Sequence, residues 1–141
     1  MSTLVLPGDV FKLVCDFPEV TKPKFLILLK TKPYEFFIIN SEINNFIANN
    51  SDLYACQVDI PHEDHKAFLT HDSIADCSGR VDTAAVIYEK QVTFNDLASH
   101  KVGRLASYVI EEIINVVENN NLTLTGKEKK AIISALRSSI E

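Results

Sequence analysis

The chain has 141 residues, of which 46% are hydrophobic and 23% are charged, with three cysteines and a formal net charge of −5. This composition is typical of one globular domain, and it excludes a disordered tail, a collagen-like repeat and a disulfide-stabilised miniprotein. The longest clean apolar run, residues 25–29, is far shorter than the about 20 residues that a membrane-spanning helix needs. The first residues lack the features of a signal peptide, so we expect a cytoplasmic protein with reduced thiols and no membrane segment.

The N-terminal part of the chain is predicted to form β-strands. After the turn signal Leu6-Pro7-Gly8-Asp9, residues 10–14 alternate between apolar and polar side chains, as a half-buried strand does. Residues 16–24 hold two prolines and are expected to be a loop. Residues 25–29 are continuously apolar, which favours a strand buried on both faces, and residues 36–39 would pair with it as a hairpin.

The middle of the chain is predicted to contain shorter elements. The asparagine-rich residues 40–50 indicate a turn or a short helix followed by a loop. Residues 53–60 alternate like a strand, and residues 61–70 are expected to be a polar loop. Two weaker strand candidates follow on either side of Ser78-Gly79, namely residues 73–76 and 84–88.

The pattern changes from strands to helices after residue 100. Residues 104–118 carry an apolar stripe wider than a surface helix needs, and core packing or a dimer interface would explain it equally well. Residues 125–128 form a capping box ahead of a second helix. Strands followed by helices predict a single α+β domain over residues 1–141, with a mainly β part in 1–90 and helices in 104–141.

The charge is spread unevenly along the chain. Residues 42–82 hold two basic and eight acidic residues, a local charge of −6. Because phosphate contacts need cations, this argues mildly against a nucleic-acid binder. No glycine-rich phosphate loop is present. The basic candidates for a phosphate contact are Lys22, Lys24, Arg80 and, on the last predicted helix, Lys127, Lys129 and Lys130, the last three being expected on a solvated face.

Other side chains could carry catalysis or bind a metal. His62 and His65 are three residues apart and could chelate zinc together with a nearby carboxylate, although a solvated polar loop explains them as well. No cysteine pair or HExxH helix completes such a site. Ser41, Ser73 and Cys77 would be nucleophiles if a base lay within reach, and Cys77 is otherwise a small buried apolar residue.

Five short motifs occur in a recognisable order. They are Gly8-Asp9-Val10, Lys22-Pro23-Lys24 before the apolar strand, Ile38-Ile39-Asn40-Ser41-Glu42, His71-Asp72-Ser73-Ile74, and Arg80-Val81-Asp82. In this order they resemble the MazF/PemK/Kid family of toxin endoribonucleases from type II toxin–antitoxin systems. The resemblance covers residues 7–83 and, loosely, the helix at 104–118, whereas residues 119–141 look like an extension.

The resemblance implies a fold, an activity and partners. The fold would be a small SH3-like curled β-barrel followed by two C-terminal helices, and the protein would be a homodimer. The activity would be cleavage of single-stranded RNA without a metal or other cofactor, with the RNA 2′-hydroxyl as nucleophile. A cognate antitoxin protein would be the partner. The alternative is a catalytically degenerate, dimeric binding module with the same fold.

The resemblance also assigns roles to residues. Lys22, Ser41 and Arg80 would be catalytic, and Lys24, Asn40 and Asp76 would bind the RNA. Lys22 stands where the family has arginine, and lysine cannot make the bidentate phosphate contact of an arginine. A nuclease predicts that these cations gather in one groove at a dimer interface. A binding module predicts that Lys22, Ser41 and Arg80 lie apart or pair with nearby acids.

Overall fold

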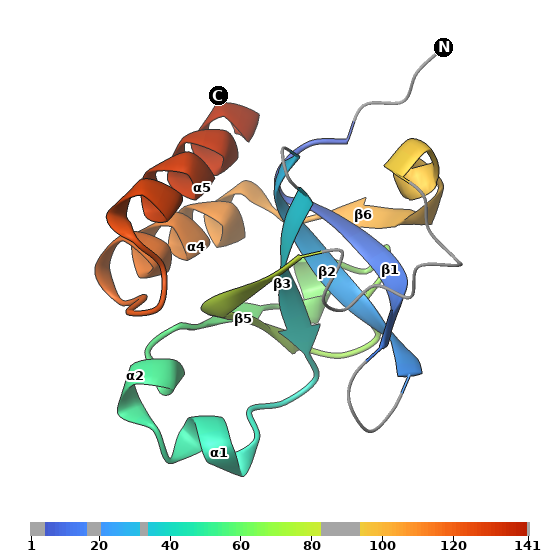
Figure 1. Cartoon of the computed structure of the whole chain (residues 1–141). Coiled ribbons are helices and arrows are strands. Elements are labelled where there is room, and N and C mark those ends of the chain that lie inside the picture. Colours follow the sequence, from blue (N-terminus) through green and yellow to red (C-terminus); the bar gives the residue numbers. More distant parts are fainter. Residues whose placement is uncertain (1–4, 17–20, 32–33, 83–93, 141) are drawn as a thin grey trace.

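The computed structural model of the protein describes residues 5–16, 21–31, 34–82 and 94–140, with the backbone alone at 14–16, 21–22, 80–82 and 94–96. A six-stranded sheet, ordered β4-β5-β3-β2-β1-β6 with every neighbouring pair antiparallel, curls around a helical layer at the C-terminal end of the chain (Figure 1). The predicted α+β class is therefore confirmed.

The strands fall in the first part of the chain, with one exception close to the helices. Their bounds are β1 Asp9–Asp16, β2 Thr21–Thr31, β3 Tyr34–Asn40, β4 Gln57–Ile60, β5 Ser73–Asp82 and β6 Lys101–Arg104. The helices are α1 Asn45–Ala48, α2 Ser51–Tyr54, α4 Ser107–Asn119 and α5 Gly126–Ser139, with the 3₁₀ helices η1 His62–Asp64 and η2 Phe94–His100.

The two faces of the sheet carry different cores. On one face, side chains such as Ile27, Phe37 and Val58 pack against the apolar sides of α4 and α5. On the other face, a smaller cluster around Phe11 and Leu26 covers only part of the sheet. Its buried members are Phe11, Leu13, Leu26, Leu28, Phe36 and Leu97, the last from η2, which lies across the sheet from α4 and α5 (Figure 1). The remaining part of this second face, over β3, β5 and β4, carries the polar side chains Asn40, Asp76 and Asp59 beside Ile38 and Ile74.

The apolar run and the capping box behave as the sequence predicts. Residues 26–29 of β2 are fully buried, because one core lies on each side of that strand. Thr125 and Glu128 form the reciprocal capping box at the start of α5. The wide stripe of α4 is buried within the single chain, at Val109, Ile110, Ile113, Ile114, Val116 and Val117. Core packing therefore accounts for the stripe without a partner.

Several expected boundaries were wrong. Leu53 belongs to α2, because the Asn50 side chain caps that helix by accepting from two backbone N–H groups, so β4 starts only at Gln57. The loop expected at 16–24 is shorter, since β2 starts at Thr21. β5 continues through Ser78-Gly79 instead of ending before them. The strand candidate at 84–88 lies outside the described residues.

The C-terminal part also contains an element that the sequence did not suggest. β6, which precedes α4, pairs with β1 at the edge of the sheet. Gly103 in this strand allows close packing, since a Cβ atom there would come within 2.5 Å of the Phe68 ring. Among the described residues, no helix has the length and apolar character needed to cross a membrane.

Candidate functional site

The part of the second sheet face that the smaller core leaves uncovered, over β3, β5 and β4, is called the open face below. It carries three of the predicted site residues. Paired residues of antiparallel strands point to the same face, and Asn40 pairs with Ile74, which pairs with Asp59. Lys24 joins this row from β2, because its Nζ donates to Asn40 Oδ1 over 3.0 Å. Lys24 and Asn40, both predicted to bind RNA, are therefore in direct contact although 16 residues separate them in sequence.

Asp76 lies one row further along the same face. It pairs with Ile38 of β3 on one side and with Gln57 of β4 on the other. Its Oδ1 accepts from Gln57 Nε2 at 2.9 Å, from the Ser78 backbone N–H at 3.1 Å and from Ser78 Oγ at 2.6 Å. These three donors fix the carboxylate in place, so it contributes a held negative charge to the open face.

Ser41 follows β3 and lines a groove of about 520 Å³ at the end of the open face. Both apolar and acidic side chains line the groove. Its other lining residues are Ile43, Ile60, Pro61, Ser73 and Ile74, with the carboxylates of Glu42, Asp59 and Asp72. Within the described part of the chain the Ser41 hydroxyl makes no hydrogen bond, so no general base contacts it.

The backbone positions of Lys22 and Arg80 are far apart in the sheet. Arg80 precedes Val81, which pairs with Phe36 of β3. Phe36 pairs in turn with Leu28 of β2. Lys22 precedes Leu28 by six residues in that strand, which corresponds to roughly 20 Å at about 3.3 Å per residue. The side chains of both residues lie outside the described part of the structure.

The two histidines of the metal hypothesis have different environments. His65 is 2% exposed, and its Nε2 accepts from the Ala106 backbone N–H at 3.1 Å. Its Nδ1 must then carry the proton and donate to Pro61 O at 2.6 Å. Neither nitrogen is left for a metal. Among the described residues no group of three histidine, cysteine or acidic side chains could hold a metal ion.

The remaining candidate nucleophiles are not activated. Ser73 Oγ lies 3.4 Å from His71 Nδ1, but that nitrogen donates to Asp72 O at 2.8 Å and so cannot take a proton from the serine. Cys77 is fully buried, and desolvation, followed by the charge of Asp76, raises the pKa of its thiol well above the ordinary value. The thiol therefore stays protonated, which supports the interpretation of Cys77 as a core residue.

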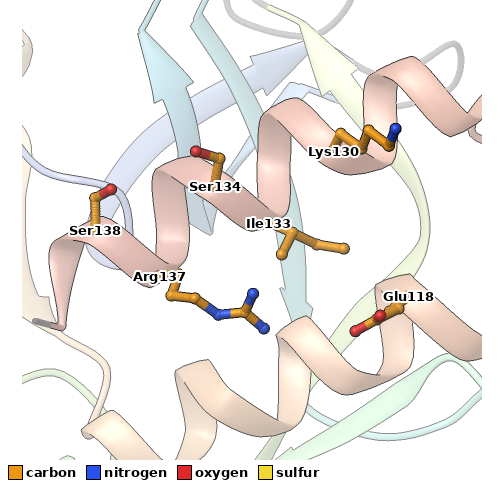
Figure 2. Close-up of a pocket in the computed structure, with 6 residues that line it drawn as sticks. All are labelled: Glu118, Lys130, Ile133, Ser134, Arg137 and Ser138. Atoms are coloured by element: carbon orange, nitrogen blue, oxygen red, sulfur yellow. The ribbon is translucent and has the colours of Figure 1, made fainter.

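The lysines of the last helix belong to a different surface. Lys127 and Lys130 are exposed on α5, which packs against the opposite face of the sheet from Lys24. Figure 2 shows Lys130 and Arg137 of α5 beside Glu118 of α4, around a groove of about 390 Å³ between the two helices. These cations therefore do not add to the positive charge at Lys24.

Asn121 is a buried residue whose role the sequence did not reveal. Its Nδ2 donates to Cys77 O at 2.7 Å, and its Oδ1 accepts from the backbone N–H groups of Thr123 and Leu124, each at 2.9 Å. Thr123 Oγ1 also donates to Ser78 O at 2.6 Å. The loop between α4 and α5 thus holds the part of β5 that follows Asp76. In the sequence, asparagine here indicates only the end of a helix.

Asp9 of the first motif is a second such residue. Its carboxylate is fully buried and lies 3.1 Å from Arg104 Nη1 and 3.3 Å from Lys101 Nζ. Arg104 Nη2 donates to Ser139 O at 3.0 Å, so the ion cluster connects the start of β1 to the end of α5. Asp9 therefore stabilises the fold and does not face the candidate site.

The open face can bind a polar ligand, but the described residues do not form an acid–base pair there. Lys24 is its cation, and Asn40 supplies an amide that can donate and accept. Asp76 and Asp59 supply negative charge on the same face. No known protein-family model matches the chain, and no curated protein matches it. The resemblance to the toxin family therefore rests on the order of its motifs.

Proposed function

We propose that the protein is a divergent member of the MazF/PemK/Kid family, an endoribonuclease that binds single-stranded RNA on the open face of its sheet. The observation that supports this is the hydrogen bond between Lys24 and Asn40. The resemblance assigns RNA contacts to both residues, which come from different strands. Lys24 would contact a phosphate and Asn40 a base or sugar edge.

The architecture is compatible with this proposal. A small antiparallel sheet that curls and is followed by two helices is compatible with an SH3-like barrel of the toxin type. The assignment of this sheet to the SH3-like barrel fold is part of the proposal. The homodimer and the antitoxin partner are also parts of the proposal.

The proposed reaction is an attack of the RNA 2′-hydroxyl on the adjacent phosphate. The bond to the 5′-oxygen of the next nucleotide breaks, leaving a 2′,3′-cyclic phosphate and a 5′-hydroxyl. Arg80 would stabilise the negative charge that develops on the phosphate, and Ser41 would position it. Lys22 and Arg80 lie at opposite ends of the sheet, so the two would act on one phosphate only if they came from different chains of the proposed homodimer.

The test is cleavage of a mixed-sequence single-stranded RNA by the purified chain in the presence of EDTA, read on a denaturing gel. The Lys22→Ala/Arg80→Ala and the Lys24→Ala/Asn40→Ala variants should lose the fragments. The Lys127→Ala/Lys130→Ala variant removes two lysines from the opposite side of the molecule and should retain them. Equal cleavage by all variants would refute the site.

A specific observation favours the alternative of a binding module without catalysis. No general base contacts Ser41 in the described part of the chain, and the backbones of Lys22 and Arg80 are roughly 20 Å apart along the strands. This alternative predicts no cleavage, either with EDTA or with added Mg²⁺, Mn²⁺ or Zn²⁺. Fluorescence anisotropy with labelled RNA would then show whether the Lys24 surface still binds.

A further inference from the structure

The edge of the sheet formed by β4 has unpaired backbone groups. Among the described strands, β4 is the last of the sheet and pairs only with β5. Cys77 N–H donates to Cys56 O, so the backbone groups of Val58, two residues later, also face β5. Those of Gln57 and Asp59 face the opposite way, and they make no hydrogen bond with any described residue.

A strand that adds to this edge would have to neutralise the negative charge of an exposed aspartate. β4 is only four residues long and carries the exposed Asp59, two features that discourage indiscriminate pairing of strand edges. Asp59 also lines the groove of about 520 Å³ next to this edge. Asp59 therefore belongs to both the edge and the groove, and a strand that adds to β4 passes directly beside it.

The groove defines which side chains an added strand would carry on that side. Its lining combines apolar side chains, among them Ile43, Pro61 and Ile74, with carboxylates. A lysine or arginine side chain fits both kinds of lining, because its methylene groups pack on apolar surface while its charged end pairs with a carboxylate. Residues 42–76 contain seven acidic residues and a single lysine, so the surrounding surface also favours a cation.

The other side of the same edge requires apolar side chains. Val58 and Ile60 point to the face covered by α4, where both are buried in the larger core. Side chains of an added strand alternate between the two faces of the sheet. Those next to Val58 and Ile60 would extend this core if they were apolar and branched.

We propose that the β4 edge and its groove bind an extended peptide segment of a partner protein in which lysine or arginine alternates with valine or isoleucine. The segment adds as a strand next to Gln57 and Asp59, and its basic side chains pair with Glu42, Asp59 and Asp72. The groove includes Ser41, which the proposed function assigns to catalysis, but Lys24 and Asn40 are not among its lining residues. Its carboxylates disfavour RNA next to β4, and strand addition to β4 does not depend on RNA cleavage.

The test uses fluorescein-labelled peptides and the full chain, with binding measured by fluorescence anisotropy. The probe has the sequence Gly-Ser-Lys-Val-Arg-Val-Lys-Ser-Gly. One matched peptide has glutamate at the three basic positions. Another has the arginine and both valines N-methylated, which removes backbone donors from both edges of the peptide strand without changing the charge. We expect the basic probe to bind at least about tenfold more tightly than either matched peptide.

Protein variants test the same surface from the other side. The Asp59→Asn/Asp72→Asn variant should bind the probe about tenfold more weakly, because it loses two of the carboxylate charges that line the groove. The control variant Glu111→Gln/Glu118→Gln loses two charges from α4, away from the groove, and should bind within about twofold of the unchanged protein. Peptide binding is measured without RNA and does not require cleavage, so this proposal can fail separately from the nuclease.

Three results would overturn the proposal. The first is the absence of saturable binding of the basic probe. The second is equal binding of the basic and acidic peptides, or equal effects of the Asp59/Asp72 and Glu111/Glu118 variants. The third is unchanged binding of the N-methylated peptide, which would show a charge contact without strand addition.

Discussion

Replacement of His65 by alanine should strongly destabilise the protein. The His65 ring connects the segment after β4 to the start of α4 through hydrogen bonds to Pro61 O, at 2.6 Å, and from Ala106 N–H, at 3.1 Å. It also packs edge-on against Phe68, with the ring centroids 5.9 Å apart. Alanine would remove all three contacts and leave the Ala106 N–H without its partner.

The expected loss follows from these contacts. Two hydrogen bonds contribute about 1 kcal/mol each, and burial of the ring contributes about 1–2 kcal/mol more. The free energy of unfolding should therefore fall by about 3–4 kcal/mol, a large part of the about 5–15 kcal/mol of a typical domain. Urea unfolding followed by far-UV circular dichroism measures this loss, since the midpoint should fall while the denaturant slope stays the same.

His62→Ala is the matched control for His65→Ala. The His62 ring makes no hydrogen bond to a described residue, and its removal should cost less than about 0.5 kcal/mol. Zn²⁺ should stabilise neither the original protein nor the two variants. The reasoning is refuted if the two variants lose equal stability, or if Zn²⁺ raises the melting temperature of the original protein only, because His65 would then be a metal ligand.

Three further predictions concern buried polar and thiol groups. Arg104→Ala should cost about 3 kcal/mol in urea unfolding, because Asp9 keeps its buried charge and loses its closest cation; a loss below about 1 kcal/mol would contradict this. Asn121→Ala should lower the free energy of unfolding by about 2–3 kcal/mol, since one side chain satisfies several backbone groups. Calorimetry measures this loss, and an unchanged melting temperature would show that these hydrogen bonds do not stabilise the fold. Cys77 should react with iodoacetamide at pH 8 at least tenfold more slowly in the folded protein than in urea, because burial raises the pKa of its thiol; equal rates by mass spectrometry would refute its burial.

Local signals in the sequence were sufficient to predict β1, β2, β3, α4 and α5. The length of the apolar run at residues 25–29 and the prolines around it favoured a strand buried on both faces, and the capping box at Thr125 marks the start of α5 within one residue. These predictions succeeded because period, length and caps are properties of a single segment. β6 is four residues long and has no detectable period, so it became visible only through its pairing with β1.

The tertiary structure decided how the candidate residues are grouped. The sequence proposed Lys24, Asn40 and Asp76 together, but their common face follows from the register of four strands, which no local pattern determines. The sequence offered His62 and His65 together as possible metal ligands, yet only the fold buries His65 between Pro61 O and Ala106 N–H. The sequence by itself therefore determined the longer strands and helices, but not β6 or the start of β4. Contacts between residues distant in the chain determined which side chains share a surface, because strand pairing and burial are non-local.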